Sequence, residues 1–280
     1  MLEARLVAKA HPQHKTSVRL SEHISIGGEE IVIIGGPCTV ESMAQMEMVA
    51  TQLQGAPVQA LRGGVYKPRT SPYAFQGLGL VGLEILAAIR ERYDMPIVTE
   101  VMAITQIETV AAHADMLQIG SRNMQNFDLL KAVGQVNKPV LLKRGLAATI
   151  EEFVMAAEYI ASAGNPNVVL CERGIRSFDP YTRNVLDLGA VAALRQITHL
   201  PILVDPSHAA GKRELIADLS RAAIACGADG LLIECHPEPE KSVSDARQAL
   251  SLEDMVRLVH SLKPVAEAVG RQVYGLKTLV

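Results

Sequence analysis

The chain repeats one pattern eight times: a short, continuously apolar run is followed by a longer segment with helical periodicity. Apolar runs without alternation indicate strands that are buried on both faces, as in parallel sheets. We expect strands at 31–36, 58–64, 96–101, 116–120, 139–145, 167–174, 201–208 and 230–237. We expect helices at 43–53, 79–92, 105–113, 127–133, 150–163, 184–196, 212–226 and 246–268.

Eight strand–helix units in about 240 residues predict an α/β fold, a single (β/α)8 or TIM barrel. A doubly wound open sheet is the structural alternative, but it would normally bring a GxGxxG fingerprint, and none follows a strand in this sequence. Residues 1–30 precede the barrel, and we expect them to form a short hairpin extension that plugs its bottom. We assign 31–270 to the barrel and 271–280 to a C-terminal tail.

Composition excludes several classes of partner. A net charge of −3 and a pI of about 6.3 argue against nucleic acid and membrane surfaces, and the absence of Trp disfavours a base-stacking surface. We expect a cytoplasmic protein, because the N-terminus lacks a signal-peptide core and no apolar run could span a bilayer. The four cysteines are irregularly spaced without a CxxC pair, which favours a ligand or reactive thiol over disulfides.

Cationic side chains gather where the second expected strand stops. The stretch RGGVYKPRT contains Arg62, Lys67 and Arg69, and Arg122 follows the fourth strand. Such cations are costly to desolvate unless an anion joins them, and arginine forks match phosphate or carboxylate oxygens in pairs. The pattern favours a site for a small, multiply charged anion, and a solvated basic loop is the alternative.

Charge lies at one end of the expected barrel. Barrel chemistry gathers at the carboxyl ends of the strands, where the βα loops open. The opposite strand ends, such as Ile31 and Pro96, carry almost no charge. At the carboxyl ends stand Cys38, Arg62, Glu100, Arg122, Lys143, Arg144, Arg173, His208 and Glu234.

A second group of residues suits a metal ion. Cys38, His208 and Glu234 end strands one, seven and eight, which closure of a barrel makes neighbours, and Asp245 follows the eighth strand. One thiolate, one imidazole and two carboxylates suit a divalent ion of borderline softness, such as Mn²⁺, Fe²⁺, Co²⁺ or Zn²⁺. Taken singly, each has a structural alternative, such as a helix cap for Asp245. Cys235 follows Glu234 on the strand and should face the other side.

These residues stand in motifs that resemble a known family. The motifs are IIGGPCTVES, RGGVYKPRTSPYAFQGLG, IGSRNMQN, LLKRG, LCERGIRSF, VDPSHAAGKR and IECHPEPEKSVSDARQAL, in unbroken order from about 30 to 255. Together they resemble 3-deoxy-D-arabino-heptulosonate-7-phosphate (DAHP) synthase, of the short type I-beta subfamily. The related 3-deoxy-D-manno-octulosonate-8-phosphate synthase shares several motifs, but it carries a KAN-type loop where this chain has Lys67-Pro68-Arg69-Thr70.

The resemblance implies condensation of phosphoenolpyruvate with erythrose 4-phosphate, the first step of the shikimate route. It implies that Arg62, Lys67 and Lys143 meet the phosphoenolpyruvate carboxylate. It places the phosphate of phosphoenolpyruvate on Arg122 and Arg173, with backbone N–H near Ser121. It assigns erythrose 4-phosphate to Arg69 and Thr70, and a divalent metal to Cys38, His208, Glu234 and Asp245.

The resemblance also bears on mechanism and regulation. Metal dependence is expected because Cys38 is not the Asn of metal-independent siblings; whether the metal activates the aldehyde or water stays open. Lys67 is our hypothesis for the proton donor and Glu100 for the residue that orients water. Family habit suggests a homotetramer. We expect no regulatory domain that senses Phe or Tyr, which leaves regulation to a partner protein. The functional alternatives are the octulosonate synthase, using arabinose 5-phosphate, and a non-catalytic anion-binding barrel.

Overall fold

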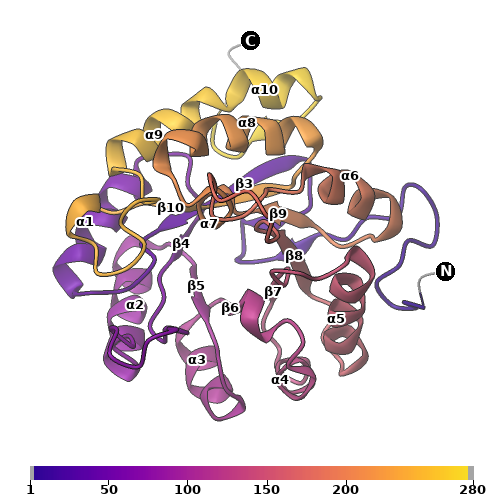
Figure 1. Ribbon diagram of the computed structural model, residues 1–280, viewed down its shortest axis with the longest axis horizontal. Coiled ribbons are helices and arrows are strands. Elements are labelled where there is room, and N and C mark those ends of the chain that lie inside the picture. Colours follow the sequence, from indigo (N-terminus) through magenta and orange to yellow (C-terminus); the bar gives the residue numbers. More distant parts are fainter. Residues whose placement is uncertain (1–2, 277–280) are drawn as a thin grey trace.

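Eight parallel strands close into a ring in the computed structural model, which describes residues 3–276 (Figure 1). Each strand pairs with the next along the chain, and the last pairs with the first, so the expected (β/α)8 barrel is confirmed. The barrel strands are β3 (Glu30–Gly36), β4 (Ala60–Arg62), β5 (Ile97–Glu100), β6 (Met116–Ile119), β7 (Val140–Lys143), β8 (Val168–Glu172), β9 (Ile202–Val204) and β10 (Gly230–Glu234).

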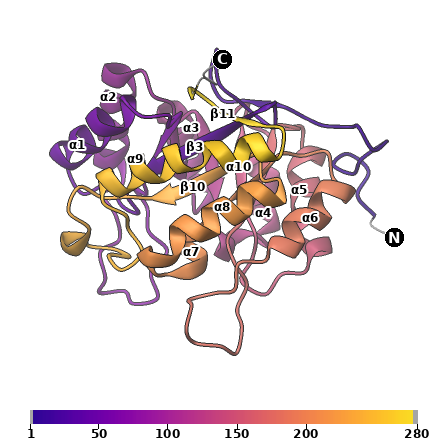
Figure 2. The ribbon, with the colours of Figure 1, turned by 90° about the horizontal axis from the view of Figure 1, so that it is seen from above.

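Helices surround this ring and cover the outer face of the strands (Figures 1 and 2). The α-helices are α1 (Met43–Gln54), α2 (Leu80–Tyr93), α3 (Ile107–His113), α4 (Phe127–Val133), α5 (Ile150–Ser162), α6 (Leu188–Ile197), α7 (Pro206–Ala210), α8 (Ile216–Cys226), α9 (Leu252–Ser261) and α10 (Lys263–Ala268). Short 3-10 turns are η1 (Ile104–Gln106), η2 (Ser121–Asn123), η3 (Arg213–Leu215) and η4 (Pro239–Lys241).

Helix starts are where the structure departs most from expectation. The helix expected from residue 184 begins at Leu188, because the Asp187 side chain accepts a hydrogen bond from a later backbone N–H and caps it. The helix expected from 246 begins at Leu252, after the cap Ser251. It is also divided in two, since Pro264 lies in the first turn of α10 and favours a new helix start.

The expected seventh strand is shorter than the sequence pattern suggested. It ends at Val204, and the side chain of Asp205 then caps the short helix α7, with Pro206 at its first position. His208 therefore lies on a helix rather than at a strand end, which corrects our expectation. Its position next to the carboxyl ends of the strands is kept, because α7 follows β9 directly.

Two apolar cores hold the barrel. The larger core fills the space between strands and helices, and the smaller one fills the inside of the ring. The N-terminal strands β1 (Val18–Arg19) and β2 (Ser25–Ile26) form the expected antiparallel hairpin. Its side chains Val18 and Ile26 are fully buried in the inner core. The hairpin thus plugs the amino-terminal end of the ring.

The two ends of the described chain attach to the barrel by backbone contacts. The Glu158 carboxylate on α5 accepts hydrogen bonds of 2.9–3.0 Å from the backbone N–H groups of residues 5–7. Near the other end, β11 (Gln272–Val273) pairs with β3. The domain boundaries at 30 and 270 stay predictions, and 277–280 of the expected tail lie outside the described residues. No helix in 3–276 is long and apolar enough to cross a membrane.

Candidate active site

A cavity of about 540 Å³ opens at the carboxyl ends of the barrel strands. Eleven of the residues expected at the site line it: Arg62, Lys67, Arg69, Thr70, Glu100, Ser121, Arg122, Lys143, Arg173, His208 and Asp245. The other two, Cys38 and Glu234, are buried beside His208 and Asp245 rather than in the cavity wall. The ends of all eight barrel strands, or the loops that follow them, therefore meet at one place although they are distant in sequence.

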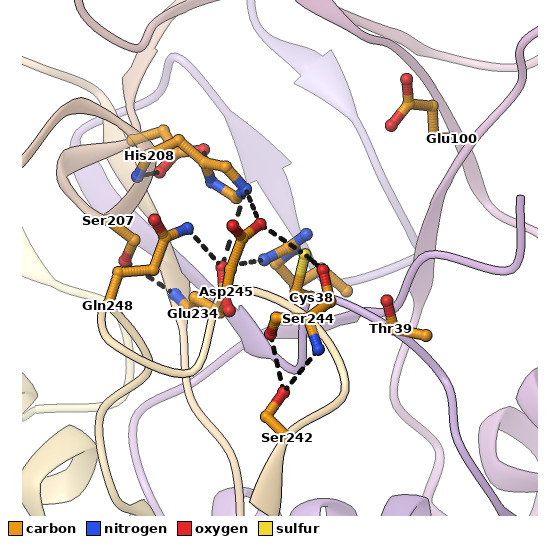
Figure 3. A network of polar contacts seen from close by, with 12 residues as sticks. Cys38, Thr39, Glu100, Ser207, His208, Glu234, Ser242, Ser244, Asp245 and Gln248 are labelled. Atoms are coloured by element: carbon orange, nitrogen blue, oxygen red, sulfur yellow. Dashed lines mark hydrogen bonds and ion pairs between the residues drawn. The ribbon is translucent and has the colours of Figure 1, made fainter. Parts of the chain in front are cut away.

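The four expected metal ligands form one cluster (Figure 3). One ligand atom from each of Cys38, His208, Glu234 and Asp245 lies within 4.8 Å of all the others. Cys38 follows β3, Glu234 ends β10, and the two strands pair directly, which brings thiol and carboxylate together. Figure 3 shows His208 and Asp245 turned toward them from α7 and from the loop after η4.

The donor set of this cluster fits a divalent cation. The Glu234 carboxylate is buried, and among the described residues its Oε1 atom finds no hydrogen-bond partner. Burial raises the pKa of Glu234 to about 7, against the opposing charge of Arg62. An uncompensated buried oxygen of this kind is expected where an ion completes the coordination. A thiolate, an imidazole and two carboxylates suit an ion of borderline softness.

His208 presents its Nε2 atom to the cluster. Its Nδ1 atom donates to Asp205 Oδ2 at 2.8 Å, and Nε2 lies 3.6 Å from Glu234 Oε2 and 3.8 Å from Asp245 Oδ2. Burial lowers the pKa of His208 to about 3, so the imidazole is neutral at pH 7. A neutral imidazole whose second nitrogen is fixed by a carboxylate is the usual form of a histidine ligand.

Asp205 is a functional residue that our sequence reasoning missed. Its Oδ2 atom accepts from both Lys143 Nζ, at 2.5 Å, and His208 Nδ1, while Oδ1 accepts from the backbone N–H of His208. Burial alone would raise the pKa of Asp205, but His208 and Lys143 outweigh it and hold that pKa well below its ordinary value. A signal was present, because an Asp-Pro pair three residues before His208 is a helix-cap pattern.

Lys67 lies in the cavity lining and also contacts Cys38, one of the four candidate metal ligands. Its buried Nζ donates to Cys38 Sγ at 2.8 Å and to the backbone oxygen of Cys38 at 2.9 Å. Burial raises the pKa of the Cys38 thiol, as does Glu234, while Lys67 and Arg62 oppose that rise. The ammonium group therefore favours the thiolate form, which is the form that binds metals.

Three buried cations lie at the floor of the cavity. Arg62, Lys143 and Arg173 are 4–5% exposed, and burial lowers the pKa of Arg173. One guanidinium nitrogen of Arg62 and one of Arg173 lack a hydrogen-bond partner within residues 3–276. Buried donors of this kind are costly unless a ligand accepts from them, so the floor is suited to an anion. Arg144, the neighbour of Lys143, faces away and contacts Glu172 and Asp187 instead.

Glu100 stands apart from the metal cluster (Figure 3). Its Oε2 accepts a 3.3 Å hydrogen bond from Gln118, and burial raises its pKa although the surrounding lysines and arginines oppose this. The carboxylate packs so closely against Gly120, which follows β6, that a Cβ there would overlap Oε1. A half-buried carboxylate beside several cations is suited to holding a water or a proton.

One loop contributes three cavity residues to which the sequence analysis assigned no role. Arg176, Arg183 and Asn184 line the cavity from the long loop between β8 and α6. Figure 2 shows this loop reaching out from the barrel. Arg176 stands in the motif LCERGIRSF, but Arg183 and Asn184 stand in none of the quoted motifs, and only the fold brings this loop over the strand ends.

Comparisons with known proteins agree with this geometry. The family model described as the DAHP synthetase I family matches residues 15–271. A phospho-2-dehydro-3-deoxyheptonate aldolase of Thermotoga maritima is 51% identical over 269 residues, which are 96% of this chain and 79% of that protein. A 2-dehydro-3-deoxyphosphooctonate aldolase of Granulibacter bethesdensis is 35% identical over 83% of this chain and 88% of its own length.

Solved structures show the same relationship. The crystal structure of a T. maritima DAHP synthase superposes with a TM-score of 0.93 at 49% identity, covering 98% of this chain and 79% of that one. A truncated form of the T. maritima enzyme gives 0.89 at 48% identity, covering 96% and 98%. The resemblance seen in the motifs is therefore confirmed across nearly the whole described barrel, and this chain belongs to the DAHP synthetase I family.

Proposed function

We propose that this barrel is a metal-dependent DAHP synthase, a transferase that condenses phosphoenolpyruvate, erythrose 4-phosphate and water to DAHP and inorganic phosphate. The observation that carries the proposal is one cavity that joins a floor of buried cations to a four-ligand metal group. Identity of 51% to a heptulosonate enzyme, against 35% to an octulosonate enzyme, favours erythrose 4-phosphate over arabinose 5-phosphate.

The cations oppose the mutual repulsion of two anionic substrates. Arg62, Lys67 and Lys143 are assigned to the carboxylate of phosphoenolpyruvate. Arg122 and Arg173 are assigned to its phosphate, with the backbone N–H near Ser121. Arg69 and Thr70, nearer the mouth, are assigned to erythrose 4-phosphate. Fixed cations of this kind hold the two reacting carbons close to each other in the orientation needed for reaction. They also stabilise the negative charge that develops.

Cys38, His208, Glu234 and Asp245 are the residues that would hold the metal. When bound there, a divalent cation supplies Lewis acidity, either to the aldehyde oxygen or to water. Lys67 is assigned the proton transfer, because its Nζ lies 2.8 Å from one ligand atom and faces the same cavity. The enol carbon bonds to the aldehyde carbon, and the aldehyde oxygen takes the proton from Lys67.

Glu100 is assigned to the second half of the reaction. Water adds to the carbon that bears the phosphate ester, and inorganic phosphate leaves. A carboxylate at Glu100 accepts a proton from that water, which is favoured by the raised pKa of its half-buried side chain. Lys67 and Glu100 thus act on opposite sides of the new bond.

The test is phosphate release from phosphoenolpyruvate, with erythrose 4-phosphate and with arabinose 5-phosphate, before and after chelation. Release with erythrose 4-phosphate that disappears on chelation and returns with Mn²⁺ would support both the substrate and the metal. Release only with arabinose 5-phosphate would favour the octulosonate reaction. Release that survives complete metal removal would contradict the role of the four ligands.

Further properties belong to the same proposal. The ion is Mn²⁺, Fe²⁺, Co²⁺ or Zn²⁺, all of which accept mixed S, N and O ligands. The four cysteines are free, which favours a reducing, cytoplasmic location. A homotetramer is supported by exposed apolar side chains such as Leu80, Val81 and Phe127. Feedback control, where it exists, is assigned to a partner protein.

A further inference from the structure

Two arginines from different loops hold the segment that carries the ligand Asp245. We call residues 242–248 the metal loop. Arg69, after β4, donates from Nη1 to Ser244 Oγ at 2.6 Å. Arg183, before α6, donates from Nη1 to Asp245 Oδ1 at 3.1 Å and to Gln248 Oε1 at 3.1 Å. The metal loop therefore accepts hydrogen bonds from arginines of two different loops.

Arg183 reaches both carboxylate ligands of the metal group. It contacts Asp245 directly. It contacts Glu234 indirectly through Gln248, which accepts from Arg183 at Oε1 and donates from Nε2 to Glu234 Oε2 at 2.8 Å. Figure 3 shows Gln248 beside Glu234, with Asp245 turned toward Cys38. One guanidinium group thus fixes the directions of two ligands that come from different parts of the loop and strand.

The backbone at Asp245 has an unfavourable conformation. Its φ angle is +55°, in the left-handed region that costs a non-glycine residue free energy. Its carboxylate also faces Glu234 and the sulfur of Cys38, groups that repel it when they are ionised. Arg183 opposes this repulsion, because its Nη1 lies 3.1 Å from Asp245 Oδ1.

Arg183 is itself fixed to the helix that carries the histidine ligand. Its backbone N–H donates to Ala210 O at 2.9 Å, and the side chain of its neighbour Asn184 donates to His208 O at 3.1 Å. Gly211 permits this approach, since a Cβ there would lie 2.7 Å from Cβ of Arg183. The position of Arg183 relative to His208 is therefore set by backbone contacts.

We propose that Arg183 is a positioning residue that aligns Asp245 and, through Gln248, Glu234 for metal binding. The inference depends on the metal site proposed above. It assigns the loop between β8 and α6 a part in metal affinity although none of its residues is a ligand. Loss of a partner that orients a ligand typically weakens metal binding about tenfold to a hundredfold.

The experiment measures Mn²⁺ binding to metal-free protein by calorimetry, with Arg183→Met and Arg183→Lys. Arg183→Met keeps most of the side-chain volume and is expected to bind Mn²⁺ at least about tenfold more weakly. The Mn²⁺ affinity of Arg183→Lys is expected to fall between, because a lysine keeps the charge but lacks the rigid, planar guanidinium whose Nη1 donates to both acceptors.

Arg176→Met is the matched control. Arg176 lines the same cavity from the same loop, but within residues 3–276 no hydrogen bond or ion pair joins its side chain to the metal loop. Its replacement is expected to leave Mn²⁺ affinity unchanged. The thermal unfolding midpoint of the metal-free Arg183→Met protein should also equal that of the unmodified protein, because Arg183 is 40% exposed.

The outcomes separate the two proposals. Failure of the unmodified protein to bind Mn²⁺ would overturn the metal site itself. Binding by the unmodified protein, with equal affinity in Arg183→Met, would overturn the positioning role alone. A weaker affinity accompanied by a lower unfolding midpoint without metal would indicate a collapsed loop, and would also overturn positioning.

Discussion

Replacing Asp205 with asparagine tests the ion pair between Asp205 and Lys143, which links the cations of the cavity floor to the candidate metal ligand His208. Asn occupies nearly the same volume and caps helices as well as Asp, so the bond to the backbone N–H of His208 is kept. What is lost is the negative charge beside Lys143, in a pair whose side chains are 1% and 6% exposed. The substitution therefore isolates the charge from the packing.

The magnitude follows from that burial. Breaking a buried ion pair costs about 3–5 kcal/mol, because the remaining charge stays buried without compensation. Lys143 also lines the cavity, where water can solvate it in part, so the lower end of about 3 kcal/mol is expected. That value corresponds to more than about a hundredfold in the unfolding equilibrium constant.

Metal affinity should fall in the same variant. The amide group of Asn would place a donor where Oδ2 now accepts from His208 Nδ1. The imidazole would then favour the tautomer with its proton on Nε2, the atom that faces the metal. A loss of about tenfold to a hundredfold in Mn²⁺ affinity is expected.

The assay is urea unfolding of the metal-free protein, followed by circular dichroism, beside Mn²⁺ calorimetry. Asp187→Asn is the control, because Asp187 also caps a helix and pairs with an arginine, but is 29% exposed and shares that arginine with Glu172. It should cost about 1 kcal/mol or less. If Asp205→Asn cost no more than this control, our reasoning about the buried pair would be refuted.

Four further predictions concern the cavity and the N-terminal segment. Lys67→Met should lower kcat at saturating substrates, and weaker phosphoenolpyruvate binding with unchanged kcat would disprove the acid role. As the pH is lowered, kcat/KM should fall at a pH above the ordinary pKa of a glutamate, since protonation of Glu100 removes the base. Glu100→Gln should have low activity, and its kcat/KM should not show this fall at acid pH. Cys38→Ser should weaken Zn²⁺ more than Mn²⁺, because a hydroxyl is a harder ligand, and equal losses in competition titrations would argue against sulfur ligation. Glu158→Ala should speed proteolysis of residues 3–14 and leave turnover unchanged, because the carboxylate accepts hydrogen bonds from the backbone of residues 5–7, far from the cavity lining; unchanged cleavage would show that other contacts suffice.

The sequence was a good guide wherever one physical pattern acted alone. Continuous apolar runs located all eight barrel strands, because a parallel strand buried on both faces leaves few other interpretations. The run PILVDPSH misled at its end, since hydropathy extended a strand through Asp205 and Pro206 where cap chemistry starts a helix. Local signals compete at such junctions, and burial does not decide between them.

The sequence predicted the candidate ligands of the site but not the residues that position them. Lys143 and Arg144 are adjacent cations at one strand end, yet only Lys143 faces the cavity, because successive side chains on a strand alternate and the sequence does not fix which one faces inward. The contact of Arg183 with Asp245 joins loops 62 residues apart. No periodicity or motif reports such a contact, which depends on the closed ring.

Closure of the barrel bottom has a consequence for the order of events in turnover. The hairpin residues Val18 and Ile26 fill the ring from below, so the described chain leaves the cavity accessible from above. Four of the cations assigned to phosphoenolpyruvate, Arg62, Lys67, Lys143 and Arg173, are buried, and only Arg122 of that group is exposed; Thr70, assigned to the sugar phosphate, is exposed as well. A sugar phosphate bound first would obstruct the path to the floor. Phosphoenolpyruvate should therefore enter before the aldose, and a dead-end analogue of the aldose should trap it inside.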